Sequence, residues 1–189
     1  ASVTGGWHGR TVATLACCDG RSYEAGALRA GMALSARVAF DDVASLDAVL
    51  DHTMAALIVE PVQGMAGARD CSPEFLAAAR RLCTERGIAL LFDEVQCGVG
   101  RSGAFTAAEL YSVVPDGLTL AKGLGSGYPI GAVVAGPMLA MGIRVGDLGS
   151  TFGGGPVACA AALATLSVIA DEDLTGNAAR VGAHIAAGA

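Results

Sequence analysis

Lysine is almost absent from this 189-residue chain: Lys122 is the only one, and the remaining basic residues are arginines. The formal net charge is -6, with acidic and basic residues scattered rather than clustered. Because no basic stripe is available to neutralise a phosphate backbone, we do not expect a nucleic acid as a partner. The isolated lysine is instead a candidate for a chemical role.

Long apolar runs are also missing. The longest, such as 88–92, are far shorter than the roughly 20 residues that span a bilayer, and the N-terminus lacks a basic segment followed by an apolar one. We therefore expect a cytoplasmic protein without a membrane partner. The six cysteines form no CxxC pair, which favours small buried thiols over metal ligands or disulfides. No bound metal is expected.

Aromatic residues make up only 5% of the chain, whereas 53% of it is hydrophobic, largely Ala, Val and Leu. The length is that of one domain. Short apolar runs alternate with helical periods, which predicts a three-layer α/β/α fold with a mainly parallel sheet. Two of the helices are expected in the last part of the chain, one from Pro156 and one after Thr175. The predicted strands are 37–40, 55–60, 88–93, 118–121 and 130–135.

The clearest helix begins with Ser72 as N-cap and Pro73 at the first helical position, and it ends at Gly87. It joins the strands predicted at 55–60 and 88–93. A right-handed crossover between parallel strands brings their carboxyl ends to one edge of the sheet, where open α/β folds bind ligands. We therefore expect the chemistry of this protein at that edge.

Two carboxylates end the strands on either side of this helix, Glu60 and Asp93. Asp93 follows the most apolar strand, so its carboxylate must be hydrogen-bonded, paired with a cation or neutralised. The protonated pyridine nitrogen of pyridoxal phosphate (PLP) is such a partner, because PLP withdraws electrons only while that nitrogen keeps its proton. Asp93 and the adjacent Glu94 could equally bind a metal or cap a helix.

Lys122 follows the strand predicted at 118–121 and precedes a glycine-rich segment, 123–127. Its amine would leave an apolar strand and enter a flexible loop that another molecule can approach closely. A lysine in such a setting can form a Schiff base with a carbonyl compound. A solvated loop lysine is the simpler alternative.

Two glycine-rich segments are candidates for binding phosphate. The segment 98–103 matches the dinucleotide pattern GxGxxG, but residues 93–97 separate it from the strand and would direct two carboxylates at a pyrophosphate. A Rossmann dehydrogenase is therefore a distant alternative. The segment 149–156 places hydroxyls and glycine amides ahead of a helix, an arrangement typical of either a phosphate site or a plain turn.

Near the N-terminus, Trp7, His8 and Arg10 bring an indole, an imidazole and a guanidinium close together in the sequence. A flat indole could stack on a flat cofactor, and an arginine can bind a carboxylate through two hydrogen bonds. A surface Trp-His pair near a chain end is the alternative.

Taken in order, these segments resemble the class III, or ornithine/acetylornithine-type, aminotransferases, which are PLP enzymes of fold type I. The resemblance covers nearly the whole chain, and the separation of Asp93 and Lys122 agrees with the spacing in that family. Several segments that match in order are far more specific than any one alone. The matching segments are 7–11, 59–64, 91–96, 121–124 and 149–154.

The resemblance implies a role for each residue around the PLP ring. Lys122 would carry the cofactor as a Schiff base, and Asp93 would form a salt bridge with the pyridine nitrogen. Val95 would pack on one face of the ring and Trp7 on the other. Gln96 would bind the ring hydroxyl.

The resemblance also implies a homodimer, in which Ser150 and Thr151 bind the phosphate of the cofactor in the neighbouring subunit. Arg10 would bind the substrate α-carboxylate, while Glu60 and His8 would lie near the cofactor. The reaction implied is a ping-pong transamination in arginine biosynthesis, from an ornithine- or acetylornithine-type ω-amine donor to the 2-oxo acid 2-oxoglutarate.

Departures from the family pattern qualify this interpretation. Trp7 stands where Phe or Tyr is usual, and Met65 stands where ornithine-like members often carry Glu. An upstream phosphate loop and a C-terminal domain with a substrate-binding arginine are absent from the chain. We therefore interpret residues 1–189 as part of the large PLP-binding domain and expect it to be catalytically incomplete. A PLP aminomutase, a PLP decarboxylase and a remnant that folds without cofactor remain alternatives.

Overall fold

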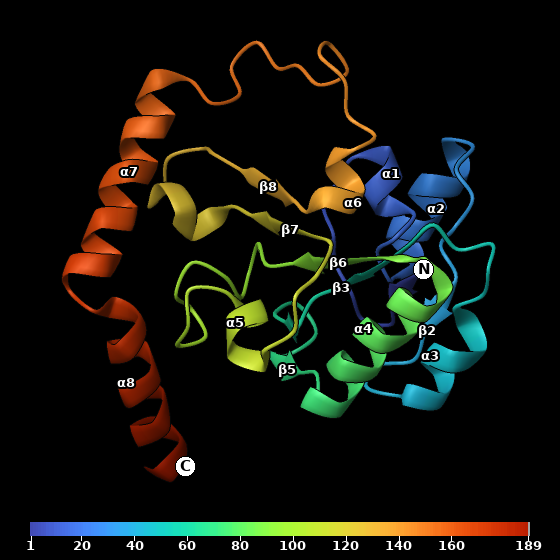
Figure 1. The fold of residues 1–189 in the computed structure, drawn as a ribbon, viewed down its shortest axis with the longest axis horizontal. Helices are drawn as coiled ribbons and strands as arrows, with labels where there is room; N and C mark the ends of the chain where they lie inside the picture. Colours follow the sequence, from blue (N-terminus) through green and yellow to red (C-terminus); the bar gives the residue numbers. More distant parts are fainter. Residues whose placement is uncertain (189) are drawn as a thin grey trace.

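A computed structural model describes residues 1–188 as a mainly parallel sheet flanked by helices (Figure 1). The main sheet has six strands in the order β2-β1-β3-β6-β7-β8, and every neighbouring pair is parallel except β7 and β8. The predicted mainly parallel α/β architecture is thereby confirmed. The strands are β1 (Ser2–Val3), β2 (Arg37–Val38), β3 (Ala56–Val59), β6 (Ala89–Asp93), β7 (Gly117–Leu120) and β8 (Ala132–Ala135), with a separate antiparallel hairpin of β4 (Val62–Gln63) and β5 (Arg69–Asp70).

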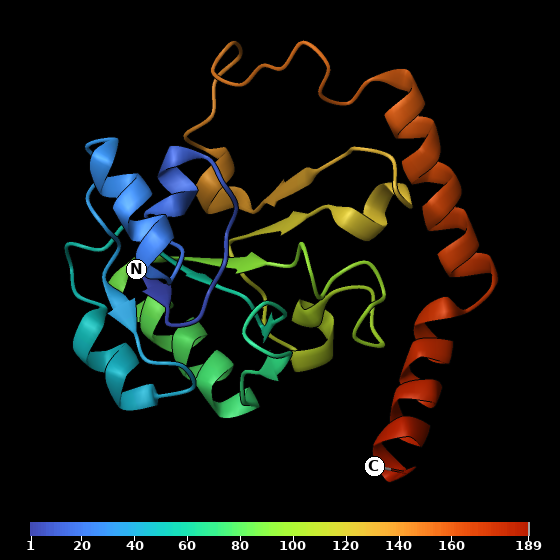
Figure 2. The same ribbon diagram turned by 180° about the vertical axis from the view of Figure 1, so that it is seen from behind.

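Helices α3 and α4 pack side by side against the sheet, and α7 and α8 form a rod along the opposite end of the molecule (Figures 1 and 2). Within residues 1–188, no helix combines the length and apolar character needed to cross a membrane. The helices are α1 (Val12–Leu15), α2 (Arg21–Arg29), α3 (Val43–Val49), α4 (Pro73–Arg86), α5 (Ala107–Tyr111), α6 (Pro137–Ala140), α7 (Pro156–Asp171) and α8 (Leu174–Gly188), with a 3-10 helix η1 (Lys122–Gly125) after β7.

Helix α4 confirms the helix predicted between the second and third predicted strands. The Ser72 hydroxyl accepts the N–H of Phe75 at 3.1 Å, and Pro73 occupies the first helical position. Gly87 ends the helix in the left-handed conformation with φ 67°, which costs a glycine little because it has no Cβ. The helix buries Phe75, Leu76, Ala79, Leu82 and Cys83.

The largest hydrophobic core lies between α4 and strands β3 and β6. Alternate side chains of these strands, Leu57 and Leu90 among them, are fully buried in this core. Ile58 and Leu91 point to the other face and are only partly buried, as the two-residue period of a strand requires. Each fully buried Leu or Phe contributes about 1.5–3 kcal/mol, so β3 and β6 form a rigid base for whatever follows their carboxyl ends.

The structure differs from the predicted strands at β1 and at the edge strand β2. Strand β1, formed by Ser2–Val3, was not predicted, although it lies between β2 and β3. The strand predicted at 37–40 is limited to Arg37–Val38. At the far edge, β8 leaves Val133 and Val134, which point to opposite faces, 73% and 53% exposed. The sheet is therefore well covered around β3 and β6 and sparsely covered at β8.

Candidate active site

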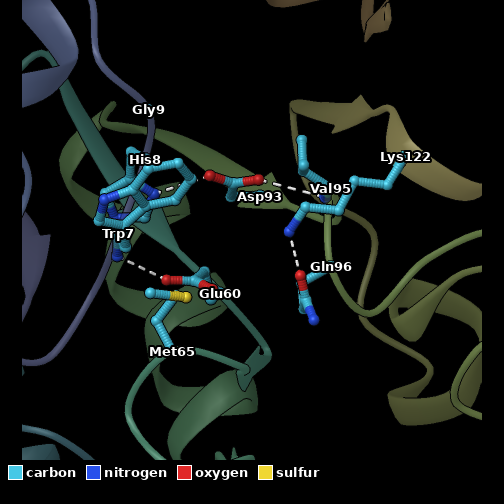
Figure 3. Close-up of a pocket in the computed structure, with 9 residues that line it drawn as sticks. All are labelled: Trp7, His8, Gly9, Glu60, Met65, Asp93, Val95, Gln96 and Lys122. Atoms are coloured by element: carbon cyan, nitrogen blue, oxygen red, sulfur yellow. Dashed lines mark hydrogen bonds and ion pairs between the residues drawn. The ribbon is translucent and has the colours of Figure 1, made fainter. Parts of the chain in front are cut away.

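A cavity of about 140 Å³ lies where the parallel strands β1, β3, β6 and β7 end (Figure 3). The predicted crossover between β3 and β6 is confirmed, since the two strands pair in parallel with Val59 opposite Phe92. Their carboxyl ends therefore bring Glu60 and Asp93 to the same edge. The cavity is lined by Trp7, His8, Gly9, Glu60, Met65, Asp93, Val95, Gln96 and Lys122.

Asp93 is held as an anion at the back of this cavity. Its carboxylate accepts hydrogen bonds from Nδ1 of His8 at 2.8 Å, the N–H of Val95 at 3.2 Å and the hydroxyl of Thr119 at 3.1 Å. Burial acts to raise the pKa of Asp93, but the hydrogen bond and charge of His8, together with the Val95 and Thr119 bonds, outweigh it and lower the pKa below its usual value. Asp93 therefore offers a negative charge to a cationic ligand.

His8 serves as the partner of Asp93, with an imidazole that is 1% exposed. Because a carboxylate only accepts hydrogen bonds, Nδ1 must carry the proton, and in the neutral ring Nε2 is left as an acceptor. Among the described residues, Nε2 of His8 and Nε1 of Trp7 are buried without a hydrogen-bond partner. The wall of the cavity thus keeps one free acceptor and one free donor.

Glu60 contacts the backbone of the neighbouring loop. Its Oε1 accepts the N–H of Trp7 at 2.7 Å, and the residue is only 4% exposed. Burial raises the pKa of Glu60, an effect that the Trp7 hydrogen bond and the charge of His8 oppose and the charge of Asp93 reinforces. Glu60 therefore positions the loop that carries the indole ring, as Figure 3 shows.

Lys122 begins η1, with one residue between it and the end of β7, and its amine donates to the side-chain oxygen of Gln96 (Figure 3). Its φ of 44° lies in the left-handed region, where a residue other than glycine is strained. Gly64 makes room for Gln96, because a Cβ on Gly64 would lie 2.4 Å from Cγ of Gln96. The amine and the amide thus meet at the mouth of the cavity.

Asp93, the last residue of β6, and the adjacent Glu94 have different roles. Asp93 lines the cavity, whereas Glu94 is 1% exposed and accepts the N–H groups of Ala107 and Ala108 at 2.6 and 2.9 Å. Glu94 therefore caps α5, one of the alternatives open from the sequence. Within residues 1–188 no group of three or more His, Cys, Asp or Glu side chains could hold a metal ion.

The GxGxxG segment at 98–103 forms a series of turns between β6 and α5. It neither starts at the strand end nor opens a long helix, since α5 has only five residues. A dinucleotide fingerprint needs both features to place a pyrophosphate on a helix N-terminus. The structure therefore removes the basis for the Rossmann alternative.

Three of the predicted site residues lie outside the cavity lining. Ser150 and Thr151 belong to the exposed segment between α6 and α7, where the Ser150 hydroxyl accepts the N–H of Gly153 at 2.9 Å. The guanidinium of Arg10 lies 6.0 Å from the ring centroid of Trp7. Within this chain, the structure gathers the residues assigned to the ring of the cofactor and separates those assigned to its phosphate.

Sequence reasoning missed two residues that shape the site. Thr119 was part of a predicted strand without a role, but in β7 it lies opposite Asp93 and donates its hydroxyl to that carboxylate. Met65 was noted only as a departure, yet it lines the cavity and is 67% exposed. Knowledge of the pairing register of β6 and β7 would have identified Thr119, because the register places it opposite Asp93, whose buried carboxylate needs hydrogen-bond partners.

The fold is a mainly parallel α/β sheet, and an anionic aspartate and an isolated lysine lie at the ends of adjacent strands. This arrangement is typical of the ligand-binding domain of an α/β enzyme. The chain matches the family model described as aminotransferase class III over residues 1–188. It is 46% identical over 170 residues to an acetylornithine aminotransferase of Methanocaldococcus jannaschii, covering 89% of this chain and 42% of that protein. It is 43% identical to acetylornithine aminotransferase 1 of Bordetella pertussis, covering 95% and 46%.

Solved structures agree with these relatives. An ornithine aminotransferase of Toxoplasma gondii, whose active site holds PLP at partial occupancy, is 34% identical with a TM-score of 0.86, covering 97% of this chain and 43% of that one. A PLP-bound amine transaminase from an uncultivated Pseudomonas species is 32% identical with a TM-score of 0.85, covering 97% and 48%.

The chain belongs to the class III aminotransferase family. The predicted resemblance and the predicted fold, that of fold type I PLP-dependent transferases, are confirmed. The chain spans less than half the length of the curated relatives it matches, at 42% and 46% of the two named above.

Proposed function

We propose that this chain is the cofactor-binding part of a PLP-dependent aminotransferase that acts on an ornithine- or acetylornithine-type ω-amine. The observation that carries the proposal is the convergence of Asp93 and Lys122 on one cavity from the ends of the adjacent parallel strands β6 and β7. Membership of the class III family supports it. The acceptor would be 2-oxoglutarate, and the two half-reactions would use the same cavity in turn.

The acceptor capacity of Asp93 fits a pyridinium ring. A carboxylate has about four lone-pair positions, and Asp93 uses three of them for His8, Val95 and Thr119. One position therefore remains for the N–H of a protonated ring nitrogen. Because Asp93 is held anionic, it would keep the proton on that nitrogen.

The other walls of the cavity fit the remaining features of the ring. Trp7 offers a flat aromatic surface and Val95 an apolar one, which suits two opposite faces of a planar group. The amine of Lys122 and the amide of Gln96, already in contact, suit an aldehyde and a neighbouring hydroxyl. The residues present therefore fit PLP.

Bound PLP would supply an electron sink that stabilises negative charge at the substrate carbon that bears the transferred amine. Lys122 would hold the cofactor covalently through Nζ, and once displaced by the amino donor the same atom would move a proton to and from that carbon. Gln96 would orient Nζ, and His8 would hold Asp93 anionic throughout. Trp7 and Val95 would limit access of water to the reacting atoms.

Residues outside the cavity would bind the phosphate of the cofactor and the carboxylate of the substrate. No cavity-lining side chain other than Lys122 and His8 is basic, and none carries a hydroxyl, so the phosphate needs other donors. We assign these to Ser150 and Thr151 of a second copy in a homodimer. Arg10, beside Trp7, would bind the substrate carboxylate.

Reductive trapping tests the proposal directly, because the sequence contains a single lysine. The protein is incubated with PLP, reduced with borohydride and mapped by peptide mass spectrometry. We expect one labelled peptide, the one that contains Lys122. Lys122→Ala is the matched control and should lose the label on this peptide. Equal labelling of both proteins would overturn the proposal.

A chimaera tests the substrate class. Residues 1–188 would replace the matching segment of the Bordetella pertussis relative, which supplies the parts of the longer protein. We expect amino transfer from acetylornithine or ornithine to 2-oxoglutarate, lost on Lys122→Ala. Product analysis separates this outcome from an aminomutase, which rearranges the amine, and from a decarboxylase, which releases carbon dioxide.

A further inference from the structure

The segment between β1 and α1 carries both Trp7 and His8, and we refer to residues 4–9 as the Trp7 loop. Three of its backbone N–H groups donate to side chains from other segments. Gly5 donates to Oδ2 of Asp19 at 2.8 Å, Trp7 to Oε1 of Glu60 at 2.7 Å and His8 to Sγ of Cys18 at 3.1 Å. The loop is therefore positioned by its neighbours.

The backbone of this loop cannot form regular structure by itself. Gly5 and Gly9 have φ of 83° and 117°, which breaks any helix or strand between them. A Cβ on Gly5 would lie 2.4 Å from the Arg69 guanidinium, so the chain also runs close to the side chains around it. Backbone groups in such a segment need partners from elsewhere.

Cys18 supplies two of those partners through one atom. Its Sγ accepts the N–H of His8 at 3.1 Å and lies 3.5 Å from the carbonyl oxygen of Gly9, to which the thiol donates. Burial raises the pKa of the Cys18 thiol, so the sulfur keeps the proton it donates. Cys18 is 0% exposed, so its thiol makes these bonds out of contact with solvent.

The adjacent Asp19 contacts the backbone of the residues that precede Trp7. Its carboxylate accepts the N–H of Gly5, and its own N–H donates to the carbonyl of Gly6 at 2.9 Å. Residues 18 and 19 therefore form hydrogen bonds with backbone groups on both sides of Trp7 in the sequence. Small shifts here would move the indole away from the cavity and the imidazole away from Asp93.

We propose that Cys18 is a positioning residue, whose buried thiol bridges the backbone at His8 and Gly9 and so fixes Trp7 and His8 in the cavity wall. The consequence for the cofactor rests on the proposed function, whereas the placement of the loop does not. A thiol in this role is a hydrogen-bonding group, and its place can be taken by another small group that both donates and accepts.

Trp7 is the only tryptophan of the chain, so intrinsic fluorescence reports on this loop alone. The test compares wild type with Cys18→Ala, which loses both bonds, and Cys18→Ser, which can keep them. Cys83→Ala is the matched control, because Cys83 is equally buried at 0% exposure but lies on α4 in the main hydrophobic core. Emission wavelength, acrylamide quenching and amide hydrogen exchange of residues 5–10 are measured without cofactor.

We expect Cys18→Ala to shift the Trp7 emission to longer wavelength and to increase quenching. The His8 amide should exchange about fivefold faster, the factor for loss of one ordinary hydrogen bond. Cys18→Ser should stay close to wild type in all three measurements, and so should Cys83→Ala. If Cys18→Ala does not fold, Cys18→Val, which fills the space without accepting a bond, takes its place with the same expectation.

Two results would overturn the proposal. One is an unchanged Trp7 signal and unchanged His8 exchange in Cys18→Ala or Cys18→Val. The other is an equal change in Cys83→Ala, which would assign the effect to general loss of stability. Addition of PLP is a separate measurement: failure of PLP to bind wild type would count against the proposed function and leave the result on Cys18 intact.

Discussion

Nδ1 of His8 lies 2.8 Å from Oδ2 of Asp93, and the two side chains are 1% and 9% exposed. His8 follows β1 and Asp93 ends β6, so the pair connects the Trp7 loop to the centre of the sheet. Removing one partner of a buried pair leaves the other charge without compensation, which costs about 3–5 kcal/mol. The same pair therefore contributes to the stability of the fold and maintains the negative charge of Asp93 in the cavity.

His8→Phe should lower the free energy of unfolding by about 3 kcal/mol at pH 7. Because the folded pKa of Asp93 is lowered, its contribution to stability is present above the unfolded pKa of about 3.9 and is lost as pH falls through the folded pKa. The penalty of the mutation should therefore shrink at low pH. Urea unfolding at pH 7 and at lower pH measures it, with the exposed His52→Phe as control. A penalty independent of pH would refute the pairing.

Glu60→Gln should leave the protein as stable as wild type at pH 7, or more stable by about 1 kcal/mol. Burial raises the pKa of Glu60, so its contribution to stability is present below the unfolded pKa of about 4.3 and is lost as pH rises through the folded pKa. The amide keeps an acceptor for the N–H of Trp7 without the buried charge. Stability of the variant should also vary less than that of wild type as pH rises above about 4.3, the unfolded pKa of Glu60.

Glu60→Ala is the control for this interpretation. It removes the acceptor as well as the charge and leaves the N–H of Trp7 unpaired, which costs about 1–3 kcal/mol. Urea unfolding curves of the two variants should therefore diverge at pH 7. Equal destabilisation by both substitutions would mean that the charge of Glu60, rather than its hydrogen bond, holds the loop.

Much of the fold could be predicted because its elements carry local patterns. Helix α4 has a cap, a proline and a glycine at the expected positions, and the apolar runs at β3 and β6 are long enough to be recognised as strands. The convergence of Glu60 and Asp93 then followed from the crossover rule. These predictions needed only short-range sequence features and one topological preference.

The remaining parts of the site depend on contacts that no local pattern encodes. Strand β1 has two residues, too few for a period, so the approach of Trp7 to the cavity rested on the family resemblance alone. The bond between His8 and Asp93 joins positions 85 residues apart, and that between Thr119 and Asp93 depends on strand register. Buried polar contacts of this kind are fixed by tertiary packing.

Lys122→Gly should be more stable than Lys122→Ala by about 1 kcal/mol. Both variants lose the bond to Gln96, but only glycine adopts the observed φ of 44° without steric cost. Urea unfolding at neutral pH measures the difference. Equal stability would show that residue 122 relaxes to an ordinary conformation once the lysine is removed. A more stable glycine variant would indicate that the fold holds this residue in a strained conformation at the cavity.

Asp93 and Glu94 are adjacent acids that should respond oppositely to amide substitution. Asp93→Asn keeps an acceptor for Val95 and Thr119 but removes the negative charge that faces the cavity. It should weaken PLP binding at least about tenfold, as loss of a charge-assisted bond does. The effect on unfolding should be smaller, because no charge is left buried and the His8 ring can carry its proton on Nε2 and accept from the amide through Nδ1. Glu94→Gln should show the reverse pattern.

The reason lies in what each carboxylate contacts. Each oxygen of Glu94 accepts one N–H group of α5. The NH2 group of a glutamine would replace one of these acceptors and face a backbone N–H, which costs about 1–3 kcal/mol of stability. PLP binding, followed by absorbance titration and by quenching of Trp7, should change little in Glu94→Gln. If both variants lost binding and stability in the same proportion, the separation of the pair into a ligand-binding acid and a helix cap would be wrong.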